Sequence, residues 1–176
     1  MKTRFAAVAT AVATVLPLSL SVFAQNVDIP EPVRVPAGHN AFMTAVGAGD
    51  LTYECKANVD KGGAMEWTFV GPVAKLTDAK TNKEVGKYYA GPTWESMDGS
   101  KITGKQVAVA PATAGNIPMQ LVKTEPAVGS GSMTGVTYIQ RVNPKGGVAP
   151  ADACTAAMGG QKKTVPYTAD YVFYKQ

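Results

Sequence analysis

The chain is poor in the residues from which many catalytic and metal sites are built. One histidine, His39, and two cysteines, Cys55 and Cys154, occur among 176 residues. So few ligands make a cysteine metal site unfavourable. A Ser-His-Asp site would have to use His39, and no nucleophile-elbow motif accompanies it. We therefore predict no metal site and no cofactor, and we expect His39 to lie on the surface at the entrance of a strand.

Charged residues are also scarce and are not clustered by sign. They make up 17% of the chain, and the formal net charge is +4. Two of the basic residues, Lys2 and Arg4, belong to the N-terminal segment, and without them 15 basic residues face 13 acidic ones. This balance gives no basis for nucleic-acid binding, and we predict no nucleic-acid partner.

One apolar run stands out, and it lies at the N-terminus. Residues 1–24 begin with two basic residues, continue through an apolar stretch at 5–20 and end on small residues. This pattern predicts a secretory signal peptide that is cleaved before Gln25. A membrane anchor is the alternative, but the run is short and Pro17 interrupts it. We therefore expect an exported protein, periplasmic or extracellular, with no membrane span after cleavage.

The two cysteines bear on the same expectation. In an exported chain an even pair predicts one disulfide, here between Cys55 and Cys154, which lie 99 positions apart. Two free thiols are the alternative. The bond would tie the first strand region of the domain to its last third.

Helical periodicity is missing from most of the chain. Apolar residues instead alternate with polar ones at 51–57, 65–69 and 165–174, which is typical of half-buried strands. Residues 152–158 form the single helical candidate. Short strands between Gly/Pro turns predict an all-β fold, a single-domain antiparallel β-sandwich or barrel with at most one short helix.

Proline and glycine suggest the boundaries inside the mature chain. Residues 25–41 contain three prolines and should form an extended N-terminal segment, and residues 42–176 should form the single β domain. Within this domain we predict a turn at 47–50 and a strand end at Gly71-Pro72.

The stretch from 85 to 105 is the richest in local signals. Asp98-Gly99 lies between two β-prone runs and predicts a hairpin, with either a two-residue loop or a three-residue loop closed by the glycine. The three-residue loop pairs Trp94 with Ile102 and Glu95 with Lys101. It brings apolar side chains together on one face and opposite charges together on the other, so we predict this register.

The same stretch contains the candidate site. The predicted ligand-binding residues are Tyr88, Tyr89, Trp94, Glu95 and Lys101. Adjacent tyrosines on a strand face opposite ways, so one of the pair can be exposed and stack on a polar, ring-bearing ligand such as a glycan. Glu95 and Asp98 are the catalytic candidates, because paired carboxylates suit glycoside hydrolysis. The alternative is that Glu95 pairs with Lys101 and that Asp98 supplies turn chemistry.

Several sequence blocks follow one another across nearly all of the mature chain. They read Y-E-C, M-E-W-T-F-V-G-P-V-A-K-L, Y-Y-A-G-P-T-W-E-S-M-D-G-S-K, I-P-M-Q-L, V-T-Y-I-Q-R-V-N-P-K-G-G-V-A-P and V-P-Y-T-A-D-Y-V-F-Y. Together with Cys154 they resemble the domain-of-unknown-function family numbered 3455, a family of exported bacterial and fungal proteins. The resemblance implies export and a single domain, and it brings no established activity.

Two positions depart from the pattern of that family. Lys87 stands where the family tends to have histidine, and Met119-Gln120 stands where it usually has tryptophan and aliphatic residues. If the histidine is catalytic in relatives, this chain cannot share that activity by the same route.

These observations lead to three functional hypotheses. We expect an exported, disulfide-bonded β-domain that acts as a non-enzymatic binding module for a glycan-like or other polar ligand. One alternative is a carbohydrate-active hydrolase that uses Glu95 and Asp98. The other is an envelope structural or inhibitor protein whose partner is another envelope protein.

Overall fold

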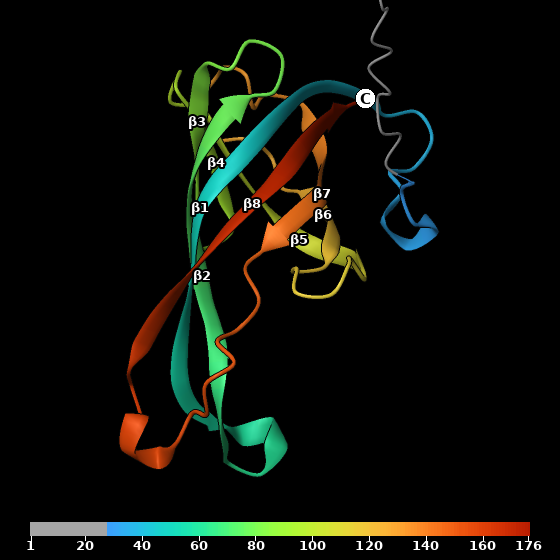
Figure 1. Cartoon of the computed structure of the whole chain (residues 1–176). Coiled ribbons are helices and arrows are strands. Elements are labelled where there is room, and N and C mark those ends of the chain that lie inside the picture. Colours follow the sequence, from blue (N-terminus) through green and yellow to red (C-terminus); the bar gives the residue numbers. More distant parts are fainter. Residues whose placement is uncertain (1–27) are drawn as a thin grey trace, which may run out of the picture.

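The computed structural model describes residues 28–176 and shows an all-β protein (Figure 1). In this part of the chain eight antiparallel strands follow one another around a closed barrel, and the last strand returns to pair with the first. The strands are β1 (Asn40–Asn58), β2 (Ala64–Asp78), β3 (Glu84–Tyr89), β4 (Thr93–Ser96), β5 (Lys101–Ala110), β6 (Met119–Thr124), β7 (Val136–Gly146) and β8 (Lys162–Lys175). The predicted fold class is confirmed, with the barrel in place of the sandwich. The predicted signal peptide lies outside the described residues.

Helical structure is limited to single turns of 3-10 helix in the described residues. These turns are η1 (Glu31–Val33), η2 (Val59–Lys61) and η3 (Ala156–Met158). The helix expected at 152–158 is therefore reduced to η3. No helix in the range 28–176 has the length and apolar character needed to cross a membrane.

The three longest strands extend past one end of the barrel and form a projection, which we call the finger (residues 54–68 and 152–164). Figure 1 shows β1, β2 and the start of β8 running together to a tip that contains η2 and η3. A disulfide joins Cys55 to Cys154, with the two Cα atoms 5.5 Å apart. The Trp67 indole N–H donates to the carbonyl of Asp152 at 2.9 Å. The predicted disulfide is thus confirmed, and it fastens a loop of the finger to β1.

Two predicted chain breaks are wrong, because the strands continue through them. The turn expected at 47–50 lies inside β1, and the break expected at Gly71-Pro72 lies inside β2. A Cβ atom on Gly47 would lie 2.5 Å from a ring carbon of Tyr171. This glycine therefore makes room for a core aromatic ring and does not reverse the chain. Pro72 and Gly71 pair with Leu51 and Thr52, and the register shifts just beyond them, between Thr52 and Tyr53.

The hairpin register predicted for β4 and β5 is confirmed. Trp94 lies opposite Ile102 and Glu95 lies opposite Lys101. Gly99 closes the three-residue loop with φ +85°, a left-handed conformation that glycine adopts at low cost. This register places Trp94 and Ile102 in the barrel interior, where both are almost fully buried.

The N-terminal segment, residues 28–39, covers part of the outer wall of the barrel. Val33 is fully buried against β5 and β6, and the Gln140 side chain donates to its carbonyl at 2.6 Å. His39 directly precedes β1, where its Nδ1 atom lies 2.9 Å from the Thr137 hydroxyl. This segment contains η1 and is otherwise extended along the surface.

Candidate functional site

The five residues predicted to bind a ligand divide between the two faces of the barrel wall. Tyr88 and Trp94 point inward, with 5% and 1% of their surface exposed, and their rings stack with centroids 4.6 Å apart. Tyr89 and Glu95 lie on the outer face, where the tyrosine hydroxyl donates to the carboxylate at 2.7 Å. Lys101 is exposed opposite Glu95. Because the wall separates the two groups, one small ligand cannot contact all five.

Glu95 belongs to a small polar cluster on the outer wall. Its carboxylate also lies 3.1 Å from the Lys87 ammonium group. The expected partner, Lys101, lies opposite Glu95 on β5 but forms no ion pair with it. Hydrogen bonds from Tyr89 and Lys87 hold the pKa of Glu95 below its usual range. The cluster borders a shallow hollow of about 240 Å³.

Asp98 connects the β4–β5 turn to the loop before β7. Its carboxylate accepts hydrogen bonds from the backbone N–H and the hydroxyl of Ser100, at 2.9 and 2.5 Å. It accepts two more from the backbone N–H and the hydroxyl of Ser132, at 2.7 and 2.6 Å. These bonds hold the pKa of Asp98 well below its usual range. The pKa of Glu95 is lowered too, so both shifts favour the ionised form, whereas glycoside hydrolysis requires one of the two carboxyl groups to be protonated.

Replacing Asp98 with asparagine is expected to lower the melting temperature at neutral pH, because an amide cannot accept the four hydrogen bonds as an anion does. Folding lowers the pKa of this group, so its stabilisation is present above the unfolded pKa of about 3.9 and is lost as the pH falls below it. The difference in melting temperature between wild type and Asp98→Asn should therefore shrink below about pH 4. Thermal denaturation followed by circular dichroism across this range measures the difference.

The control for this experiment is Asp28→Asn, because the side chain of Asp28 is fully exposed. Its melting temperature should match that of wild type at every pH. A difference between wild type and Asp98→Asn that stays constant as the pH falls would contradict the role assigned to the Asp98 carboxylate.

The barrel interior opens to solvent beside the base of the finger, and we call this opening the mouth pocket. Its volume is about 380 Å³. Most of its walls are apolar or aromatic, from Leu51, Tyr53, Phe69, Tyr88, Ile117 and Pro118. Its polar side chains are those of Gln106, Gln120 and Arg141 besides the two tyrosine hydroxyls. The candidate residue Tyr88 therefore lies in a cavity, although most of its ring is covered by the core.

Arg141 is the single charged residue among those that line the mouth pocket. It is half-buried on β7, and its Nε and Nη2 atoms donate to the carbonyl of Pro118 at 3.2 and 3.0 Å. These two bonds hold the guanidinium at the edge of β6. The side chain of Arg141 is thus fixed in the opening of the barrel by a neutral partner.

Two tyrosines, Tyr53 and Tyr88, line this opening, and Tyr167 and Tyr171 are buried in the core. Burial raises the pKa of Tyr53, Tyr88, Tyr167 and Tyr171, and the nearby Arg141 guanidinium lowers it in part. The pKa of Tyr167 rises to about 12. Their hydroxyl groups therefore remain protonated at physiological pH and act as hydrogen-bond donors.

Unused hydrogen-bond donors remain in the mouth pocket. The Tyr53 hydroxyl donates to the Gly147 carbonyl at 2.7 Å, and the Gln120 amide donates to the Gln106 side-chain oxygen at 2.5 Å. The Tyr88 hydroxyl makes no hydrogen bond within residues 28–176. Arg141 retains N–H groups beyond the two that contact Pro118, because a guanidinium carries five.

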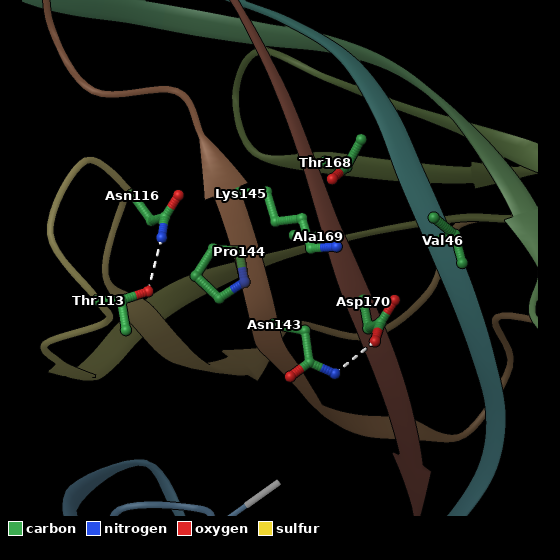
Figure 2. A pocket seen from close by; sticks show the side chains of 9 residues that line it. All are labelled: Val46, Thr113, Asn116, Asn143, Pro144, Lys145, Thr168, Ala169 and Asp170. Carbon is green, nitrogen blue, oxygen red and sulfur yellow. Dashed lines mark hydrogen bonds between the residues drawn. The ribbon is translucent and has the colours of Figure 1, made fainter. Parts of the chain in front are cut away.

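A second concavity lies on the outer wall, over β1, β7 and β8 (Figure 2). Its volume is about 670 Å³, but most of its polar side chains bond to one another. Asn143 donates to Asp170 at 2.7 Å, and Asn116 donates to Thr113 at 2.8 Å. No aromatic ring lines it. The mouth pocket differs from it in having three aromatic residues, Tyr53, Phe69 and Tyr88, in its lining.

No three of the metal-binding side chains His, Cys, Asp and Glu come together within residues 28–176 in a way that could hold a metal ion.

A family model described as "Protein of unknown function (DUF3455)" matches residues 36–175 of the chain. The chain belongs to this family. The match confirms the resemblance noted from the sequence blocks, and it covers all eight strands and the residues of the mouth pocket. No curated protein and no solved structure matches the chain.

Reasoning from sequence identified Tyr88 but missed Tyr53, Phe69 and Arg141 as residues of the same pocket. One signal for Arg141 was available, because it follows Ile139 by two positions on a strand and so shares its inward face. A charged residue in phase with core positions is uncommon unless it has a partner or a function. The closure of the barrel, which brings β1, β2 and β7 to one opening, gave no local signal.

Proposed function

We propose that this protein is a non-enzymatic binding module that holds a small, ring-bearing molecule in the mouth pocket. The observation that carries the proposal is the lining of this pocket, which combines aromatic walls with one guanidinium in a volume of about 380 Å³. Cavities of this size with mostly apolar walls and a few convergent polar groups are typical of small-molecule sites. The lining contains no carboxylate, imidazole or thiol, and so it suits binding better than acid–base or nucleophilic chemistry.

The proposed ligand is still a ring-bearing molecule, as expected from the sequence, but its site is the mouth pocket and not the whole set of five predicted residues. Phe69 and Tyr53 meet edge to face, with ring centroids 5.8 Å apart, at the rim of the pocket. Aromatic faces of this kind can pack against the flat apolar face of a sugar ring or of another ring system. The residues on the outer wall, Tyr89, Glu95 and Lys101, are not needed for this site.

Export is part of the same proposal. The disulfide between Cys55 and Cys154 indicates an oxidising environment, because such bonds are rare in the cytosol. This supports the expectation of a periplasmic or extracellular protein that acts after signal cleavage. A binding module in such a compartment would meet its ligand outside the cytoplasm.

The fluorescence of N-phenyl-1-naphthylamine, which increases in apolar sites, tests whether the mouth pocket binds a ring-bearing molecule. We expect saturable binding to wild type and an affinity about tenfold weaker for Phe69→Ala, because losing one aromatic wall removes roughly 1.4 kcal/mol of contact. Phe69 is 51% exposed, so its removal should leave the fold intact.

Phe42→Ala is the matched control. Phe42 is 41% exposed and lies near the opposite end of β1, away from the mouth pocket. This variant should bind the dye like wild type. Equal weakening by both substitutions, or no saturable binding to wild type, would refute the proposed site.

A further inference from the structure

We propose that the mouth pocket selects ligands in which a flat apolar ring carries an oxyanion, such as a carboxylate or a sulfonate. This inference rests on the proposed function, since it names the chemical class of the ligand held at the same site. Three features of the described pocket support it: a cation paired only with neutral groups, an unused hydroxyl donor and an aromatic rim.

Within residues 28–176 no opposite charge pairs with Arg141. Its hydrogen-bond partners, the carbonyl of Pro118 and the hydroxyl of Tyr171, are neutral. A half-buried charge without a counter-charge is costly, because it loses part of its hydration without regaining that free energy from an ion pair. An anionic ligand would supply the missing counter-charge.

The geometry of Arg141 is also prepared for such a ligand. Because the Pro118 carbonyl holds one edge of the guanidinium, the side chain is already oriented and loses little freedom when a ligand binds. The remaining N–H groups suit the two oxygens of a carboxylate, for which paired guanidinium bonds are the usual mode of recognition.

Tyr88 provides a second donor to the same cavity. Its hydroxyl has no hydrogen-bond partner in the described part of the chain, and the residue lines the pocket together with Arg141. Burial raises the pKa of Tyr88, so the hydroxyl stays protonated and can donate to an anion. With Arg141 and Tyr88 both donating, a ligand must present acceptors on the part that enters the barrel.

The rim selects the rest of the ligand. Tyr53 and Phe69 stand at the opening, and the backbone at Gly71-Pro72 and Gly91-Pro92 forms the adjacent wall. These surfaces offer apolar contact and no charge. A planar ring would lie between them while its anionic group reaches Arg141.

The test compares two probes of nearly the same shape, anionic 2-naphthoate and neutral 2-naphthamide, titrated separately into the wild-type protein by isothermal calorimetry. We expect naphthoate to bind at least about tenfold more tightly, as hydrogen bonds to charged groups exceed those between neutral groups. Arg141→Met should reduce the ratio of the two affinities to about one. Lys145→Met, which removes an exposed cation from the same strand in the outer concavity, should leave the ratio unchanged.

The possible results separate the two proposals. Equal affinities of naphthoate and naphthamide for wild type would overturn the anion preference and leave the binding function standing. Absence of binding by either compound would overturn both. A preference for naphthoate that persists in Arg141→Met and disappears in Lys145→Met would place the anion outside the mouth pocket and would also overturn the inference. The comparison on wild type needs no variant, so it holds even if Arg141→Met does not fold.

Discussion

Replacing Trp94 with alanine is expected to lower the free energy of unfolding by about 3–5 kcal/mol, the usual cost of deleting a large aromatic side chain from a core. The Trp94 ring is 1% exposed and stacks on Tyr88 inside the barrel. It also meets Tyr171 at a centroid distance of 6.0 Å. Neither neighbour can fill the space that alanine would leave, because both are fixed by their own strands. Equilibrium unfolding in urea, followed by circular dichroism, measures the loss.

Tyr89→Ala is the matched control for this prediction. Tyr89 lies one position from Tyr88 on β3 and faces the outer wall, where its contacts are with Glu95 and Lys87. Its removal should change the free energy of unfolding by less than about 1 kcal/mol, as surface substitutions usually do. If Trp94→Ala were as stable as Tyr89→Ala and bound ligands poorly, Trp94 would be a ligand platform and its placement in the core would be refuted.

Removing the disulfide is expected to lower the free energy of unfolding by about 2–4 kcal/mol, the typical contribution of a native bond. The bond closes a segment of 99 residues and joins β1 to the loop before β8 within the finger. Without it, the unfolded chain gains conformational freedom, and the loop is left with contacts such as the bond from Trp67 to Asp152. The double variant Cys55→Ser with Cys154→Ser, unfolded in urea, tests this expectation.

Two comparisons give this experiment its controls. Wild type treated with dithiothreitol should unfold like the double variant, and the double variant should not respond to the reductant. Hydrogen exchange should show the largest loss of protection in the finger, because the barrel strands keep their pairing on both sides. A double variant as stable as oxidised wild type would contradict a stabilising role for the bond.

The position of the mouth pocket follows from how the barrel is filled. The stacked rings of Tyr88 and Trp94, with Tyr171 against them, occupy the interior. Toward the finger, the walls carry Arg141, Gln106 and Gln120 beside apolar side chains such as Leu51 and Ile117. A small barrel has room for little more than its own side chains, so the pocket lies at the opening and not in the middle of the barrel.

For the candidate site, the sequence predicted the strand pairing correctly but not which residues lie together. The pairing of Trp94 with Ile102 followed from the turn residues and from the alternation on each strand, which are local properties. Alternation also placed Tyr88 and Tyr89 on opposite faces. It could not say which face was inside, because both faces of this stretch carry aromatic rings. For this reason the five predicted residues were grouped as one site, although the wall separates them.

Local patterns in the sequence were sufficient to determine the all-β class, the hairpin at Asp98-Gly99 and the pairing of the two cysteines. Each depends on side-chain alternation, turn chemistry or residue count, and none requires knowledge of distant neighbours. The tertiary structure decided the continuity of β1 through Gly47, the projection of the finger and the mouth pocket. These features depend on contacts between residues far apart in the chain, such as Gly47 with Tyr171 and Arg141 with Pro118. The contact of Gly47 with Tyr171 exists only once the eighth strand has closed the barrel on the first.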